Sequence, residues 1–213
     1  MQQSNGYIIG FVVVLCLVIG GLLAGTSTFL APAQQKSIEL ETKSSILAAV
    51  RSLVTVNEGD NVLDIYNKRI SSQVVDYKGN IVTKDEKGNP IQAEKVDIVK
   101  NYKKAPEERL YPVYKLVDQQ DTSKVKAYIV PVYGNGLWDK IWGYVALDAS
   151  TETIVGTSFD HKGETPGLGQ RIATQEIQDR YVGKKIYDES GKLVTENGSK
   201  GNFQVIFEHS KHL

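Results

Sequence analysis

The N-terminal segment most limits how this chain can fold, because the first 35 residues contain no Asp, Glu, Lys or Arg. Residues 7–30 read YIIGFVVVLCLVIGGLLAGTSTFL, and their apolar centre runs from Ile8 to Ala24. A helix needs about 20 mainly apolar residues to cross the hydrocarbon core of a bilayer. We therefore predict one transmembrane helix over residues 7–30, preceded by a short tail of residues 1–6.

A cleaved signal peptide is the competing interpretation, since Ala31-Pro32-Ala33 resembles a small-residue cleavage site. Two features favour a retained anchor. The apolar run is longer than the hydrophobic region of a usual signal peptide, and no Lys or Arg precedes it. The short uncharged tail is the easier side to leave in the cytoplasm, so we expect residues 31–213 to form an extracytoplasmic domain.

The remaining chain has the composition of a water-soluble domain and excludes several classes of site. Its 25 basic and 25 acidic side chains balance, whereas a nucleic-acid binder needs a basic surplus. The single cysteine, Cys16, excludes an intrachain disulfide and a cysteine-based metal cluster. The three histidines are too scattered to indicate a metal site. We predict neither bound metal nor a nucleic-acid partner.

The pattern of apolar residues predicts an α+β domain, with an antiparallel sheet flanked by helices. Pro32 should break the first helix, and an amphipathic helix should follow from Ser37, with an apolar face of Ile38, Ile46, Ala49, Val50 and Leu53. Short strands or hairpins are expected near residues 74–77 and 81–83. The most strand-like segments are residues 110–117, 127–133, 141–147 and 153–159. A last helix should run from Thr174 to about Gly183.

Two stretches carry the candidate site. The first, HKGETPGLGQRI at residues 161–172, lacks the third glycine of a dinucleotide fingerprint, but its bare backbone at Gly167 and Gly169 would let a flat ligand approach. The alternative is an ordinary strand-to-helix connection with Glu164 in solvent. The second, PVYGNGLWDKIWGY at residues 131–144, gathers aromatic residues around a Gly-Asn-Gly turn. It predicts either simple hairpin packing or the apolar wall of a pocket.

Together these stretches resemble the C subunit of the sodium-translocating NADH:quinone reductase and, more distantly, the G subunit of the Rnf electron-transport complex. The resemblance implies a single-pass protein of the bacterial inner membrane, whose periplasmic domain carries FMN and relays electrons from NADH towards quinone. The other membrane subunits would be its partners, and NADH and quinone would be reached only through them. No catalytic acid or base is implied. The residues implied to line the flavin are Leu137, Trp138, His161, Glu164, Thr165, Gly167, Leu168 and Gly169.

One motif departs from the family pattern. The resemblance implies that FMN is attached through a phosphoester to a threonine in an S-G-A-T motif, which this sequence lacks; Ser190-Gly191-Lys192 is no substitute. We expect the C-terminal end of the domain to lie outside the sequence, and loss of covalent attachment is the other reading. Three functional alternatives stay open: an Rnf-type subunit, a membrane-tethered binding or assembly module without redox chemistry, and a secreted enzyme cleaved after Ala33.

Overall fold

The computed structural model describes residues 4–56, 59–85 and 87–187, which fall into two compact units. The first unit is Met1–Glu41 and the second is Thr42–Leu213. Helix α1 spans Asn5–Ala49 and therefore supplies most of the first unit and the first helical turns of the second.

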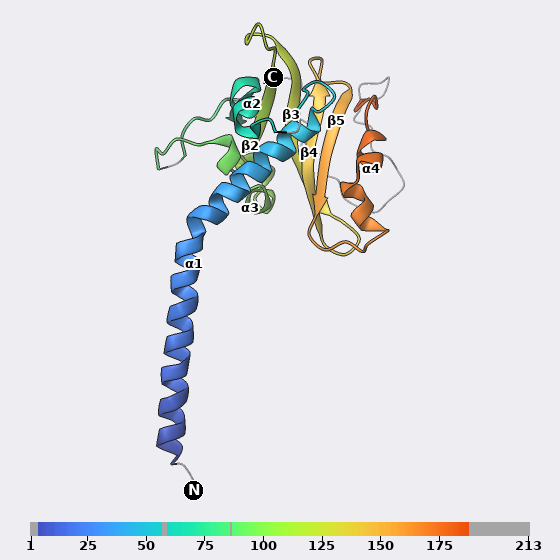
Figure 1. Ribbon diagram of the computed structural model, residues 1–213. Helices are drawn as coiled ribbons and strands as arrows, with labels where there is room; N and C mark the ends of the chain where they lie inside the picture. The colour runs from blue at the N-terminus through green and yellow to red at the C-terminus, as the bar shows by residue number, and fades with distance from the viewer. Residues whose placement is uncertain (1–3, 57–58, 86, 188–213) are drawn as a thin grey trace. The chain divides into compact units, whose positions relative to one another are not determined.

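In the first unit, α1 is long and apolar enough to cross a membrane (Figure 1). Its most apolar window has a mean hydropathy of 2.8 and no buried residue, and no other helix among the described residues meets the same criteria. The hydroxyl of Thr26 donates to the carbonyl of Leu22 at 2.8 Å, and that of Thr28 donates to Ala24 at 2.9 Å. Such bonds satisfy hydroxyl groups that an apolar medium would leave unpaired.

The prediction that Pro32 breaks the helix is wrong, because Pro32 lies inside α1. The hydroxyl of Ser37 caps no new helix and instead donates to the carbonyl of Ala33 at 3.2 Å. A proline in a helix interior removes one backbone hydrogen bond and costs about 3 kcal/mol. The turns on both sides of Pro32 keep their own bonds, and their sum outweighs that loss.

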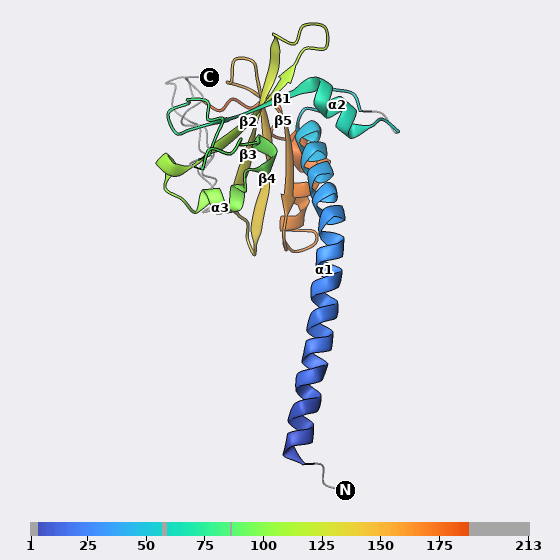
Figure 2. The same cartoon turned by 90° about the vertical axis from the view of Figure 1, so that its left-hand side faces the viewer.

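The second unit contains a five-stranded sheet in the order β1-β2-β3-β4-β5, with every neighbouring pair antiparallel. This confirms the predicted α+β class, and strands β2 to β5 lie within two residues of the bounds predicted for them. The first strand is longer than the sequence suggested. The strands are β1 Ile70–Val75, β2 Tyr111–Val117, β3 Val125–Asn135, β4 Lys140–Asp148 and β5 Ile154–His161 (Figures 1 and 2).

Both faces of the sheet are covered, because successive residues of β4 enter different apolar clusters. Ala146 belongs to a cluster with the end of α1 and helix α2, Val62–Arg69. Val145 and Leu147 belong to a second cluster on the other face. Of the predicted apolar face after Ser37, Ile46, Ala49 and Val50 are fully buried, whereas Ile38 and Leu53 are 61% and 43% exposed.

The remaining helices are short: α3 Ile98–Tyr102 and α4 Gln175–Asp179, with 3-10 turns η1 Ala93–Lys95, η2 Pro106–Glu108 and η3 Gly169–Ala173. The last helix is shorter than predicted because the chain after it joins the sheet. The N–H of Gly183 donates to the carbonyl of Ile154 at 2.8 Å, and the N–H of Ile154 donates to Lys184 at 2.9 Å. Gly183 has a φ of 83°, so it turns the chain as expected.

Candidate functional site

The two stretches singled out in the sequence meet at one end of the sheet. Asn135 pairs with Lys140 across the β3–β4 turn, and Ile141 pairs with His161 at the end of β5. The Gly-Asn-Gly-Leu-Trp turn and the loop after β5 therefore leave neighbouring strands side by side, at the lower end of the sheet in Figure 1.

Glu164 joins the two loops. Its side chain is only 6% exposed, and Oε1 accepts hydrogen bonds from the backbone N–H groups of Trp138 at 3.0 Å and Asp139 at 3.1 Å. Bonds from N–H groups to a carboxylate are stronger than those between neutral groups. The alternative of a solvated Glu164 is therefore wrong, and we call this arrangement the Glu164 clamp.

Two glycines make room for the clamp. A Cβ atom at Gly136 would lie 2.2 Å from Oε1 of Glu164, and one at Gly169 would lie 2.1 Å from Oε2. Both distances are far below van der Waals contact, so a larger residue at either position would displace the Glu164 carboxylate. Gly167 has a different need: its surroundings are open, but its φ of 78° disfavours other residues.

The rest of the loop after β5 folds tightly on itself. The N–H of Glu164 donates to Nδ1 of half-buried His161 at 3.3 Å. The carbonyl of Thr165 accepts from the N–H groups of Leu168 and Gln170 at 3.1 and 3.3 Å. His161 and Thr165 thus shape the loop through ring and backbone atoms, and Leu168 and Gly169 follow at its tip.

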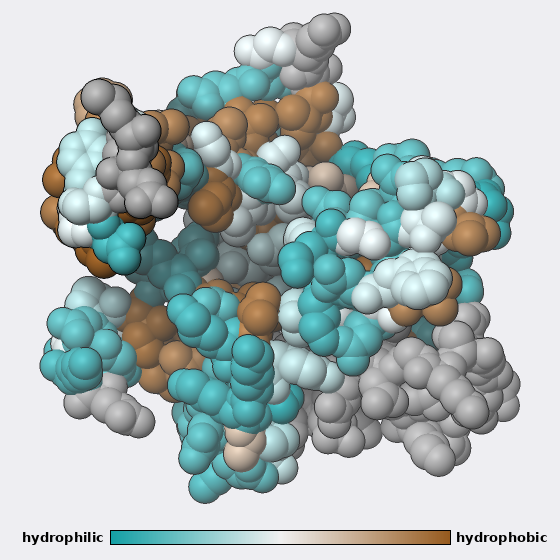
Figure 3. Space-filling model, turned by 90° about the horizontal axis from the view of Figure 1, so that it is seen from below, coloured by the Kyte–Doolittle hydropathy of each residue, from teal (hydrophilic) through white to brown (hydrophobic). Residues whose placement is uncertain are grey.

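Three large apolar side chains stay exposed beside the clamp: Leu137 and Trp138 are each 72% exposed, and Leu168 is 66% exposed. Seen from below, the domain is mostly hydrophilic with separate apolar patches (Figure 3). Exposed apolar groups on two loops held together by one carboxylate offer a surface for a flat aromatic ligand. The structure places the eight predicted site residues in these two loops or at their ends, with His161 closing β5 and Gly169 opening η3.

One polar atom of the site has no partner. Oε2 of Glu164 is the buried side-chain oxygen without a hydrogen bond among the described residues. A buried acceptor left unpaired costs free energy, so its presence calls for an explanation such as a functional role. The unpaired oxygen and the exposed apolar side chains beside it fit a planar heterocycle with ring N–H groups.

Sequence reasoning missed two residues of this site, Gly136 and Asp139. The N–H of Lys140 donates to Asp139 at 2.8 Å and, with an ion pair to Lys162 at 3.3 Å, lowers the pKa of the Asp139 carboxyl below its ordinary value. The Gly-Asn-Gly-Leu-Trp-Asp stretch contained both residues, but nothing in it indicated a buried partner 26 residues away. In the ranges that the structure describes, no group of three acidic, His or Cys side chains could hold a metal.

Comparison with known proteins identifies the family. The model of the FMN-binding domain matches residues 136–205, which include the clamp. The C subunit of the Na(+)-translocating NADH-quinone reductase of Pseudomonas aeruginosa is 31% identical over 92% of this chain and 78% of its own length. The crystal structure of the corresponding C subunit from Parabacteroides distasonis matches this chain with a TM-score of 0.64 at 29% identity. The match covers 78% of this chain and 74% of the Parabacteroides chain.

A second crystal structure, that of NqrC from Shewanella oneidensis, agrees with a TM-score of 0.55 at 26% identity, over 74% of this chain and 80% of the other. The likeness therefore covers about three quarters of this chain in both structures. The chain belongs to the NqrC family, the C subunits of the Na(+)-translocating NADH-quinone reductases.

Proposed function

We propose that this chain is the FMN-carrying subunit that relays electrons within a sodium-translocating NADH:quinone reductase. The observation that carries the proposal is the Glu164 clamp, which fixes two loops inside the segment matched by the FMN-binding domain. The Rnf-type alternative loses support, because the relatives compared above are subunits of the sodium pump.

The described residues divide the work of binding FMN between them. Leu137, Trp138 and Leu168 supply the exposed apolar surface, and the backbone from Thr165 to Gly169 supplies close approach. His161 and Glu164 anchor that backbone, because His161 bonds the N–H of Glu164 and the Glu164 carboxylate bonds the N–H of Trp138. When bound, FMN supplies the electron-carrying chemistry, while the protein positions it and sets its electrostatic surroundings. No proton transfer by a side chain is required.

The membrane topology is part of the proposal. Residues 7–30 would span the inner membrane, residues 1–6 would be a cytoplasmic tail, and residues 31–213 would be the periplasmic FMN domain. The apolar composition and length of α1 support it. The other membrane subunits of the complex would be the partners, and NADH and quinone would be reached through them.

This topology predicts which positions a reagent outside the cell can reach. In a Cys16→Ser background, a cysteine in place of Gln119, in the exposed β2–β3 turn, should react in spheroplasts with a membrane-impermeant maleimide. A cysteine in place of Ser4 should react only after the membrane is permeabilised. The reverse pattern would place the domain in the cytoplasm.

FMN content tests the function directly. We expect the chain, purified within its complex from native membranes, to carry about one FMN per chain, because a cofactor carries this chemistry. In-gel fluorescence after denaturation separates covalent from dissociable flavin, and extraction measures the dissociable part. Absence of both would overturn the proposal and favour a tethered module without redox chemistry.

A further inference from the structure

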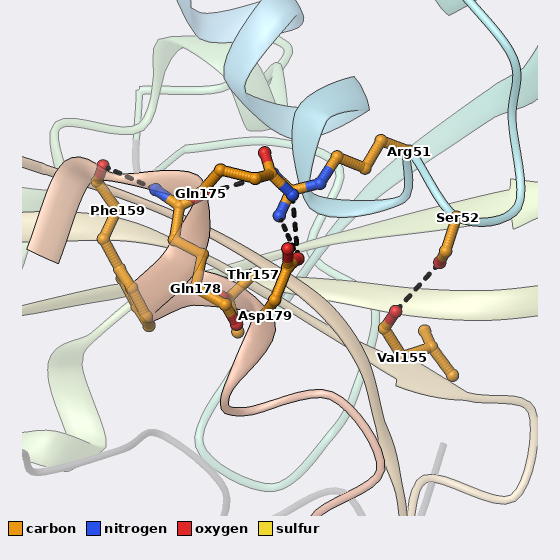
Figure 4. Close-up of polar contacts among 8 residues, drawn as sticks. All are labelled: Arg51, Ser52, Val155, Thr157, Phe159, Gln175, Gln178 and Asp179. Carbon is orange, nitrogen blue, oxygen red and sulfur yellow. Dashed lines mark hydrogen bonds and ion pairs between the residues drawn. The ribbon is translucent and has the colours of Figure 1, made fainter.

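Beyond the backbone bonds of Ile154 to Gly183 and Lys184, the outer edge of β5 is closed by side chains. The hydroxyl of Ser52 donates to the carbonyl of Val155 at 2.9 Å. The side-chain amide of Gln178 donates to the carbonyl of Phe159 at 3.2 Å, and the hydroxyl of Thr157 donates to the carbonyl of Gln178 at 3.2 Å (Figure 4). The segment after α1 and helix α4 are thus bound to the same strand.

Arg51 ties these two segments to each other. Its guanidinium donates to Oε1 of Gln178 at 3.1 Å and to Oδ1 of Asp179 at 2.8 Å (Figure 4). Gln178 is only 5% exposed, and its amide both accepts from Arg51 and donates to Phe159. A buried amide with both ends bonded holds its neighbours in one arrangement. We call Arg51, Gln178 and Asp179 the edge joint.

Close backbone packing keeps the end of α1 on this edge. A Cβ atom at Gly156 of β5 would lie 2.1 Å from the carbonyl oxygen of Ala49, the last residue of α1. Arg51 follows two residues later, so its position relative to β5 is fixed by backbone contact. The Arg51 guanidinium therefore bonds α4 from a backbone position that is held against β5.

The edge joint holds the helix that directly follows the proposed flavin loop in the chain. Helix α4 follows η3, which begins at Gly169, and the hydroxyl of Thr174 between them donates to the carbonyl of Arg171 at 2.7 Å. The Glu164 clamp fixes the start of the loop, whereas α4 fixes its end. Because α4 has only five residues, it needs contacts outside itself to stay in place.

We propose that Arg51 and Gln178 are positioning residues for electron relay, which act by fixing the end of the loop formed by residues 165–173. This inference rests on the proposed function and extends it, since the loop is the backbone assigned to FMN. Both residues act on the loop through α4 rather than at its tip. Loosening the edge joint should therefore alter loop order and the surroundings of the flavin while leaving the sheet intact.

The test compares Arg51→Met with Arg180→Met in the complete purified complex. Arg180 is the matched control, because it caps the C-terminus of α4 but pairs with Glu176 at 2.6 Å and is 63% exposed. Hydrogen exchange at residues 165–173 reports on the bonds from the N–H groups of Leu168, Gln170 and Arg171. We expect exchange there about tenfold faster in Arg51→Met, the effect of one lost buried bond.

Two further readouts separate positioning from general stability. Exchange in β2 and β3 should stay at the wild-type rate, and the visible circular dichroism of the flavin should change in Arg51→Met while FMN content does not. Arg51→Lys should restore part of the protection, because a lysine reaches one acceptor where the arginine fork reaches two.

Unchanged exchange in the loop of Arg51→Met, equal effects of Arg51→Met and Arg180→Met, or faster exchange across the whole sheet would each overturn the inference. Failure of the proposed function looks different. A wild-type complex without FMN would overturn the proposed electron-relay function. The exchange comparison would still decide whether the edge joint orders the loop.

Discussion

Glu164→Ala is expected to lower the rate of NADH-driven quinone reduction by the purified complex by about tenfold or more. The change removes the acceptor for the N–H groups of Trp138 and Asp139 and so releases the β3–β4 turn from the loop after β5. Hydrogen bonds to a charged partner contribute about 1.5–3 kcal/mol each, so losing two is enough for a tenfold effect. Hydrogen exchange at residues 136–139 measures the released turn.

The same change should disturb global stability less than the loss of two bonds suggests. Oε2 of Glu164 is buried without a partner in the described part of the chain, and removing it relieves that desolvation cost. Glu164→Gln should fall between wild type and alanine, because its amide oxygen can still accept from the turn. Glu176→Ala is the control, since its carboxylate is 62% exposed and pairs only at the surface. Full activity in Glu164→Ala would rule out the clamp as a functional element.

The sheet could be predicted because its signal is local. Alternating apolar residues and turn glycines lie within each hairpin. The sequence therefore predicts strands β2 to β5 to within two residues. Two turns can be predicted for the same reason: the sequence Asp-x-Lys-Gly-Asn occurs at residues 76–80 and 85–89. In each copy one Asp oxygen accepts from the lysine and asparagine N–H groups at 2.8–2.9 Å, which makes two equivalent turns.

The site could be predicted only in outline. The family resemblance led to the two correct loops, but the sequence could not indicate that Glu164 is buried, because its partners lie on another strand. The edge joint is more remote still, since Arg51 and Gln178 are 127 residues apart. Pro32 shows the opposite limit: a strong local preference was overridden by the hydrogen bonds of the turns around it.

Gly136→Ala should reproduce the effect of Glu164→Ala without touching the carboxylate. The new methyl group would lie 2.2 Å from Oε1 of Glu164 and 3.0 Å from the carbonyl oxygen of Asp139. Overpacking of this kind costs about 1–3 kcal/mol. The clamp can relieve it only by moving the carboxylate away from the turn. We expect faster exchange at residues 136–139 and a fall of about tenfold in quinone reduction, by the same loss of hydrogen bonds.

Gly163→Ala is the matched control for this prediction. It lies in the partner loop, and a Cβ there would meet its nearest atom, Oδ2 of Asp139, at an ordinary 3.5 Å. The decisive comparison is the double variant Gly136→Ala with Glu164→Ala. If both changes act by breaking the clamp, the double variant should be no slower than the slower single one, whereas additive losses would mean that Gly136 serves the site in another way. Coupling between these positions therefore measures whether one carboxylate holds the two loops together.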